Sequence, residues 1–579
     1  MPEAPYRELT VAAAVVGVLI GSVMTAAFVY VCLKLGFGLG GSTVAAILGF
    51  AVLKGVLGKG TIVENNINQT IASGVNNASS GVSFTLPALF ILHASGKAED
   101  FSVLPILLAA LGGSFLGIVF IIPLRKQMIE LERLRFPSGI AVASLLKSPG
   151  AGARQAKLLL GGFLIAAFFH VLVAMGVLHE EIQLGSYFGL PAYAPIALGI
   201  SFASIGAGLL SGKGGLPFVA GGVLAWWVIA PVAALLGWMP SPEDLQLAET
   251  PEGFDSYLAW DVGYYAMLRP MGIGILIGGA LSGVVASFPA VRAALSGLAA
   301  AAKAPGGGEE MSPKVMYVGI VCAFLVLFAA SVLSSDQIGL GQAALTALVG
   351  TVWLALAGLI VAQATGMTDI SPLSGMSLIG VTLMFFLSGG NVVTAIVLGI
   401  AVCIGIGQCA DMMSDLKAGH LIGAKPKRQQ MAQFAVAWVG VPIAIGVIYL
   451  LWSQGEGGMN GFGPMNPELS APQGTVLAAI IESLQQGASP LDKYVSGGAI
   501  GLALGIYPIG GLGVLIGLAM YLPLYITLTY GVGCVTSIML QKRNGARWMS
   551  DTLVPVAAGF IIGEALTNLT VVLVKLAAG

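Results

Sequence analysis

One apolar run, TVAAAVVGVLIGSVMTAAFVYVCL at residues 10–33, decides the class of fold because it has the length and composition of a membrane span. An α-helix needs about 20 mostly apolar residues to cross roughly 30 Å of hydrocarbon. The residues before the run lack the basic segment and the small-residue cleavage site of a signal peptide. We therefore expect this run to be kept as the first transmembrane helix.

The composition of the whole chain excludes a water-soluble globule. Of its 579 residues, 57% are hydrophobic and 9% are charged, whereas about 25% of the residues in an ordinary soluble domain are charged. The 82 glycines suit the close helix contacts of membrane proteins. A formal net charge of -1 gives no reason to expect a nucleic-acid partner, and the five scattered cysteines indicate neither disulfides nor a zinc site.

Apolar runs of spanning length recur to the end of the chain and predict an all-α, polytopic integral membrane protein with about 16 transmembrane helices. Two further stretches, 67–95 and 470–487, are interrupted by polar residues and predict broken helices. Basic residues gather in loops such as 125–135 and 417–428, which places these loops and the N-terminus on the cytoplasmic side. We expect a multi-pass membrane protein.

The order of spans and polar segments suggests an internal duplication. We predict an N-terminal transmembrane half at 1–298, a Gly-rich cytoplasmic linker at 299–312 and a C-terminal half at 313–579. A polar interruption begins at a similar distance after the first span of each half. Eight spans per half would give parallel repeats related by an axis along the membrane normal. Chance spacing in a Gly-rich chain is the alternative explanation.

The segment 64–77 places seven carboxylate or amide side chains within or beside a span, where lipid cannot solvate them. Gly74, Gly81 and Pro87 would let this helix break, and the freed groups could hold a peptide, a carboxylate or an ion. The alternative is that the amides pair across helices as packing contacts. We predict substrate-binding roles for Asn65, Asn68, Gln69, Asn76 and Asn77.

Two residues of the second half are predicted to line the same cavity. Asp369 follows hydroxyl and turn residues in the segment 364–372, and Gln473 begins the amphipathic stretch near 471–486. Asp369 could instead cap the helix that begins near Ser371, which is a common position for Asp.

Buried acids are candidates for carrying a proton, because a charge within the bilayer is costly and usually faces a cavity. The proton-coupling candidates are Glu64, Asp411, Asp415, Glu482 and Glu564. Asp411 and Asp415 are four residues apart and share a helix face, although a solvated helix end would explain them too. Cys409, Met413 and His420 lie near that face but offer too few ligands, so we predict neither a metal site nor a cofactor.

Signatures of catalysis are missing from the sequence. The segment Ser211–Gly214 lacks the first Gly and the Ser or Thr of a Walker A motif, so ATP is not expected to drive the protein directly. His179 is not followed by the second His of a zinc protease helix, and no Ser/His/Asp or Cys/His motif is recognisable. We predict that the protein is not an enzyme.

Several short motifs together resemble the oligopeptide transporter family, in the pattern of its bacterial and yellow-stripe-like members. The matching stretches are Arg7–Thr10, Glu64–Ile67, Gln69–Ser73, Phe84–Ala88, Pro123–Arg125, Phe136–Gly139, Asp411, Asp415–Gly419, Gly423–Ala424, Arg428–Gln430, Ala471–Gln473 and Tyr521–Pro523. The Asn-Pro-Gly motif of the peptide branch is absent, because Glu468 follows Asn466–Pro467. Its Lys-Ile-Pro-Pro-Arg motif is absent too.

The resemblance implies a secondary active transporter, usually proton-coupled, that carries small peptides in one branch and peptide-like metal chelates in the other. We therefore expect symport of such a small molecule with protons, by alternating access between the halves. The alternative is a passive channel or facilitator for a small polar solute. Membrane lipid is the other expected partner, and self-association into a homo-oligomer is left open.

Overall fold

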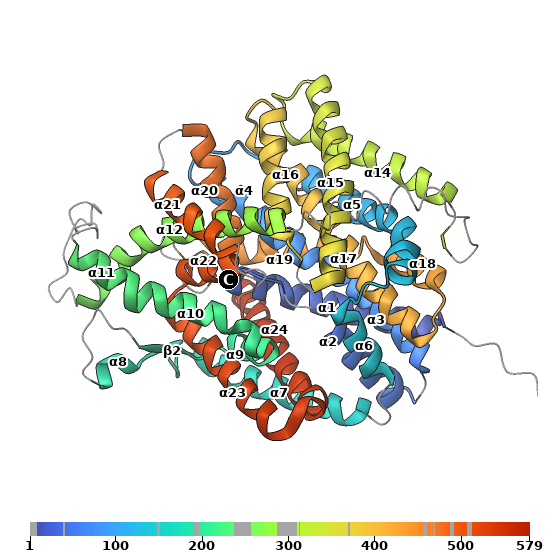
Figure 1. Ribbon diagram of the computed structural model, residues 1–579, viewed down its shortest axis with the longest axis horizontal. Coiled ribbons are helices and arrows are strands. Elements are labelled where there is room, and N and C mark those ends of the chain that lie inside the picture. The colour runs from blue at the N-terminus through green and yellow to red at the C-terminus, as the bar shows by residue number, and fades with distance from the viewer. Residues whose placement is uncertain are drawn as a thin grey trace, which may run out of the picture. The chain divides into compact units, whose positions relative to one another are not determined.

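The computed structural model describes residues 8–38, 41–58, 60–147, 151–188, 196–236, 256–286, 310–311, 313–368, 371–455, 460–464, 466, 469–486, 491–505 and 512–578. Its chain forms two compact units (Figure 1), and each unit combines one segment from either predicted half. Unit 1 comprises Met1–Leu158 and Ser287–Gln485, and unit 2 comprises Leu159–Ala286 and Gln486–Gly579. Of the predicted linker, all but Glu310 and Met311 lies outside the described residues.

Unit 1 is built from helices. They are α1 (Val11–Leu35), α2 (Gly41–Phe50), α3 (Ile62–Asn76), α4 (Ala78–Ala94), α5 (Val103–Ile121), α6 (Pro137–Lys147), α14 (Pro313–Ser334), α15 (Leu340–Thr368), α16 (Leu373–Leu387), α17 (Val392–Ile422), α18 (Pro426–Val436), α19 (Gly440–Trp452) and α20 (Pro472–Gln486). Shorter π- and 3-10-helical turns follow α2 and α5, at Ala51–Val56, Ile122–Leu124 and Lys126–Leu131.

Unit 2 is also helical, apart from one short antiparallel ribbon. Its helices are α7 (Ala151–Ala174), which begins in unit 1, α8 (Leu184–Tyr187), α9 (Phe202–Ser211), α10 (Leu216–Leu224), α11 (Ala230–Leu235), α12 (Ser256–Ala286), α21 (Leu491–Gly505), α22 (Leu512–Tyr521), α23 (Leu524–Trp548) and α24 (Val554–Ala578). Turns lie at Gly212–Gly215, Ala225–Ile229 and Met549–Leu553. Strand β1 (Glu181–Gln183) pairs with strand β2 (Ala197–Gly199), and Ile182 lies opposite Leu198.

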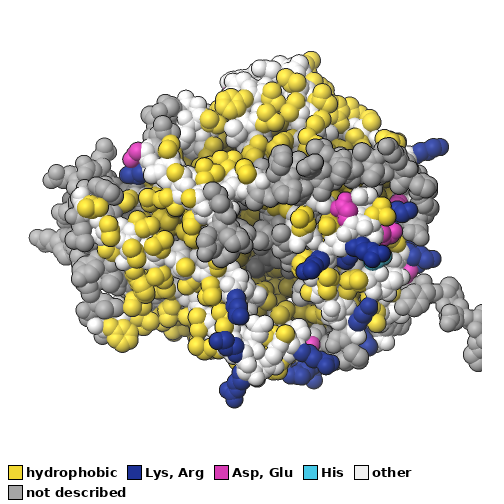
Figure 2. Space-filling view, viewed as in Figure 1, with side chains coloured by type: hydrophobic (Ala, Val, Ile, Leu, Met, Phe, Trp, Pro, Cys, Tyr) yellow, Lys and Arg dark blue, Asp and Glu magenta, His cyan; other side chains and the backbone are white. Residues whose placement is uncertain are grey.

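The described residues contain nine helical segments long and apolar enough to cross a membrane, and four shorter apolar helices. The all-α prediction is therefore confirmed. The exposed side of α15 is apolar at helical spacing, with Leu345, Leu348, Val352 and Leu356 facing outward. Figure 2 shows hydrophobic side chains covering the part of the surface formed by α15 and α16. Such a face suits lipid.

Local contacts explain where the long helices begin and end. The Thr10 hydroxyl accepts from Ala13 N at the start of α1, and Gly36 ends that helix with a φ of 75°. Asn391 caps α17 through a bond from Thr394 N, and Gly423 ends it with a φ of 82°. Both helices therefore combine a side-chain N-cap with a left-handed glycine at the C-terminus.

The apolar part of α17 is completely buried and forms the centre of unit 1, packed against α4, α5, α15 and α16. The predicted interruption beside it occurs at Asn77, where α3 ends and α4 begins. Gly81 and Pro87 do not break the chain, because α4 runs through both. The break at Asn77 therefore lies about one helical turn from Gly74 and Gly81, and nearly three turns before Pro87.

Candidate functional site

The polar residues of α3 face the interior of unit 1. Asn65 and Asn68 are buried. The Asn65 Nδ2 donates to the Ala46 carbonyl of α2 at 3.3 Å, and the Asn68 Nδ2 donates to the Ala13 carbonyl of α1 at 2.9 Å. These amides therefore join α3 to two neighbouring helices, as the packing alternative expects.

Two further predicted binding residues lie at the junction of α3 and α4. The Asn77 Nδ2 donates to the Ile404 carbonyl of α17 at 3.1 Å. The Asn76 Oδ1 accepts from the Ser79 hydroxyl at 3.3 Å. Both asparagines are buried, so this junction is polar inside the helical bundle.

Asp415 of α17 is the acid that these helices enclose. Its side chain is 1% exposed, and its Oδ1 accepts from Gln69 Nε2 at 2.6 Å and from the Ser42 hydroxyl at 3.0 Å. The Gln429 Nε2 of α18 donates to the Asp415 carbonyl at 3.0 Å and to the Thr70 hydroxyl at 2.9 Å. Residues of α2 and α3 thus bond the Asp415 carboxylate, and Gln429 of α18 bonds the backbone carbonyl of the same residue.

Many buried polar atoms on α17 and on the helices that pack against it have no hydrogen-bond partner within the described chain. On α3, α17 and α18 they are Asn65 Oδ1, both polar atoms of Asn66, Asn68 Oδ1, Gln69 Oε1, Asn77 Oδ1, Asp415 Oδ2, Gln429 Oε1, and both amide atoms of Gln408 and Gln433. Native interiors leave few such atoms unpaired, and bound water or a ligand usually satisfies them. We call this set of residues, with Ser42, Thr70 and Ser73, the amide cluster.

Glycines make the room in which some of these amides lie. A Cβ atom added at Gly49 would lie 2.0 Å from Asn68 Oδ1, and one added at Gly407 would lie 2.9 Å from Asn77 Oδ1. The missing side chains of these two glycines therefore leave the space that the amide oxygens of Asn68 and Asn77 occupy between helices.

The structure gives two of the other predicted acids local partners near helix ends. Glu64 forms a capping box at the start of α3, with bonds of 2.7 Å from Thr61 N to its carboxylate and 3.1 Å from its own N to Thr61 Oγ1. Glu482 of α20 forms an ion pair with Lys97. Asp411, one turn before Asp415, is half-buried, and no hydrogen bond is found for its carboxylate within the described chain.

Glu564 lies in unit 2 and is 0% exposed. Its carboxylate accepts from the Ser201 hydroxyl at 3.0 Å and from Ala203 N at 2.8 Å, at the start of α9. A negative group at a helix N-terminus interacts favourably with the helix dipole. These contacts give the acid a structural role of its own.

Of the two predicted binding residues of the second half, the structure describes Gln473 but not Asp369. Gln473 lies in the first turn of α20, and its Nε2 donates to the Gly36 carbonyl at the end of α1 at 2.9 Å. Asp369 lies outside the described residues.

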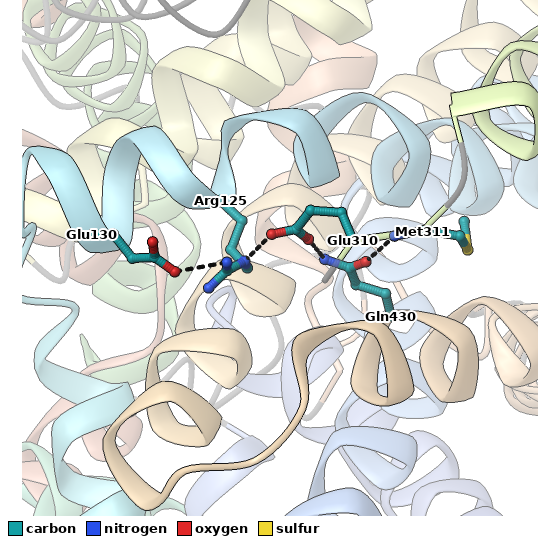
Figure 3. A network of polar contacts seen from close by, with 5 residues as sticks. All are labelled: Arg125, Glu130, Glu310, Met311 and Gln430. Atoms are coloured by element: carbon teal, nitrogen blue, oxygen red, sulfur yellow. Dashed lines mark hydrogen bonds and ion pairs between the residues drawn. The ribbon is translucent and has the colours of Figure 1, made fainter. Parts of the chain in front are cut away.

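A second polar network lies at the end of the predicted linker (Figure 3). The Arg125 guanidinium is 1% exposed and pairs with Glu310 and, at 2.7 Å, with Glu130. Gln430 of α18 donates to the other oxygen of Glu310 and accepts from Met311 N at 2.9 Å. The network thus joins the linker end to the turn after α5 and to α18, whose Gln429 contacts Asp415.

Sequence reasoning missed several residues of these networks, chiefly Ser42 and Gln429 as neighbours of the acid. The run Arg428–Gln430 is polar and lies between apolar spans, which could have marked it. In the described part of the chain, no group of three or more His, Cys, Asp or Glu side chains is placed to hold a metal ion.

Comparison with known proteins connects this sequence to transport. The sequence model of the OPT oligopeptide transporter protein family matches residues 8–575. A Haemophilus influenzae protein named, by inference, as an oligopeptide transporter is 27% identical over 82% of this chain and 78% of its own length. A metal-nicotianamine transporter of Arabidopsis thaliana is 24% identical, over 80% of this chain and 74% of its own length.

A third relative extends the similarity to another chelate carrier. It is the iron-phytosiderophore transporter yellow stripe 1 of Zea mays, 23% identical over 57% of this chain and 51% of its own length. The family match covers nearly the whole chain and is a match to transporters, not enzymes. This polytopic membrane protein therefore belongs to the oligopeptide transporter family, as its sequence motifs implied.

Proposed function

We propose that the protein is a secondary active transporter that carries small peptides or peptide-like metal chelates together with protons. The names of its relatives support both cargo classes. The observation that carries the proposal is the amide cluster, in which an unpaired carboxylate oxygen and many unpaired amide atoms are buried between helices. Amides can pair with the peptide groups of either cargo, and the carboxylate can bind a proton.

Among the five predicted proton-coupling acids, we rank Asp415 first. Glu64, Glu482 and Glu564 each have a local partner that accounts for their position. Asp415 keeps one oxygen that has no partner among the described residues, and Asp411 lies one turn away on the same helix. A buried carboxylate without a cationic partner is usually neutralised, and protonation during the cycle would do this.

Uptake into proteoliposomes with an inside-negative potential tests the proposal. One coupled proton at 100 mV supplies about 2.3 kcal/mol, or roughly fiftyfold accumulation. We expect Asp415→Asn to abolish accumulation while binding and exchange of the same peptide or chelate persist. Glu64→Gln is the matched comparison, because Gln also forms a capping box. Downhill flux without accumulation in the wild type would favour the passive channel.

We also propose the finer architecture predicted from the sequence: about 16 spans in two parallel repeats that alternate access. Support comes from the two units, since each takes one segment from either half in the same order. The proposed orientation places Lys425 and Lys427, at the start of α18, on the cytoplasmic side of a bacterial inner membrane. A cysteine at Lys427 should react with an impermeant maleimide only from the inside.

A further inference from the structure

The Asp415 carboxylate is buried, and no basic partner is found for it in the described part of the chain. Within the described chain, the ion pairs found involve other acids, namely Glu8, Asp100, Glu130, Glu310, Glu482 and Asp551. An isolated carboxylate is very unfavourable in a protein interior, so its charge must be neutralised by a proton or balanced by a cation.

Within the described chain, the two donors found at the Asp415 carboxylate bond the same oxygen. Gln69 Nε2 and the Ser42 hydroxyl both donate to Oδ1. The Ser42 and Ser73 hydroxyl oxygens lie 3.2 Å apart. Gln69 Oε1 and Asp415 Oδ2 have no partner within the described chain, and both side chains are buried. The groups left over are therefore oxygens from α3 and α17, beside hydroxyl oxygens from α2 and α3.

A proton on Oδ2 would provide only one donor for this surplus of oxygens. A metal cation can interact with several oxygens at once, and carboxylate, amide carbonyl and hydroxyl oxygens are the ligands that hard cations prefer. No sulfur or imidazole ligand is found in this group of four side chains, which disfavours a soft transition metal. One carboxylate balances one positive charge.

We propose that Asp415, Gln69, Ser42 and Ser73 form a binding site for a small monovalent metal cation, with Na⁺ as the probe ion. The site coincides with the amide cluster on which the proposed function rests, and the cation would occupy the carboxylate in place of the proton. The protein would then be able to couple transport to a metal-ion gradient. Binding itself is independent of the cargo.

Thermal unfolding of the purified protein in detergent tests this proposal. NaCl is titrated against choline chloride at constant ionic strength, and equilibrium binding of ²²Na⁺ is measured in parallel. A cation that binds only the folded state raises the unfolding midpoint with saturation. We expect a saturable rise with Na⁺ and binding of about one ion per chain, as one carboxylate implies. Asp415→Asn should abolish both.

Asp100→Asn is the matched control, because it makes the same chemical change at an exposed carboxylate, which lies 3.7 Å from His93. It should leave the Na⁺ response unchanged. Ser42→Ala with Ser73→Ala keeps the charge and removes two hydroxyl ligands, which should raise the half-saturating Na⁺ concentration about threefold to tenfold. This variant decides the matter if Asp415→Asn does not fold.

The proposal is wrong if wild-type protein responds to Na⁺ as it does to choline, or if Asp415→Asn keeps the full response. These measurements contain no peptide or chelate. A failure to transport either cargo would therefore overturn the proposed function without affecting the cation site, and absence of Na⁺ binding would leave proton-driven transport standing.

Discussion

At the scale of single residues, glycine decides how closely the buried amides approach the neighbouring helices. A Cβ atom at Gly49 would lie 2.0 Å from Asn68 Oδ1 and 2.6 Å from Asn65 Oδ1. Both amides donate to backbone carbonyls, so neither moves without weakening a buried hydrogen bond. We expect Gly49→Ala to lower stability by about 1–3 kcal/mol, measured as a lower thermal unfolding midpoint in detergent.

Gly55→Ala is the control for this substitution. Gly55 lies one turn and a half further along the same helical run, and an added Cβ would meet nothing within 4 Å. Alanine also restricts the unfolded chain, so the midpoint should stay the same or rise slightly. An equal loss of stability in both variants would mean that contact with the amides is not what requires glycine at position 49.

Residues also mark the limit of prediction from sequence. The sequence identified Glu564 as a buried acid, and the structure shows it fully buried. It could not show that Ala203, 361 residues away, donates a backbone N–H to this carboxylate. Apolar runs and isolated acids are local signals, whereas the difference between a proton carrier and a helix-capping acid depends on long-range packing.

At the scale of helices, the network of Figure 3 holds three segments together. Arg125 pairs with Glu130 and Glu310, and Glu310 also accepts from Gln430 of α18. Glu310→Gln should cost about 1–3 kcal/mol, because a charged hydrogen-bond acceptor is lost. Arg125→Met should cost more, about 3–5 kcal/mol, because two partly buried acids lose their shared cation. Thermal unfolding of both variants and of the double variant measures the coupling.

The exposed pair of Arg547 and Asp551 provides the comparison. Its charged atoms are 3.9 Å apart and the Arg547 side chain is 86% exposed, so solvent screens the attraction. Arg547→Met should change the unfolding midpoint little, as for most surface pairs. If Glu310→Gln lowers the unfolding midpoint as little as Arg547→Met does, charge interactions are not what fixes the linker end to its neighbours.

Helices differ in how well sequence predicts them. The first span and α17 stand out as long apolar runs with Thr or Asn before them and Gly after them. In contrast, α18 begins with basic residues and glutamines, and apolar length does not mark it. The residues 191–210 form another apolar run of spanning length, but β2 and the short α9 occupy its described part. Gly199 and the prolines before it in the sequence do not favour a continuous helix.

At the scale of the whole molecule, each unit needs segments from both predicted halves. In unit 1, α17 from the second half packs against α3, α4 and α5 from the first half. Gln69 and Asp415, which share a hydrogen bond, are 346 residues apart. Neither half alone therefore contains the complete core of a unit, and an isolated half would expose surfaces that are buried in the native protein.

We therefore expect a chain divided between Gly306 and Gly307 to assemble only when both pieces are present. With an affinity tag on one piece, co-expressed pieces should co-purify as a single monodisperse species, whereas each piece alone should aggregate through its exposed apolar surfaces. A division between Gly405 and Ile406 is the control, because it cuts the buried centre of α17 and should prevent assembly even with both pieces. A first piece that is monodisperse alone would show that its helices do not need α17, and the two-segment description of unit 1 would then fail.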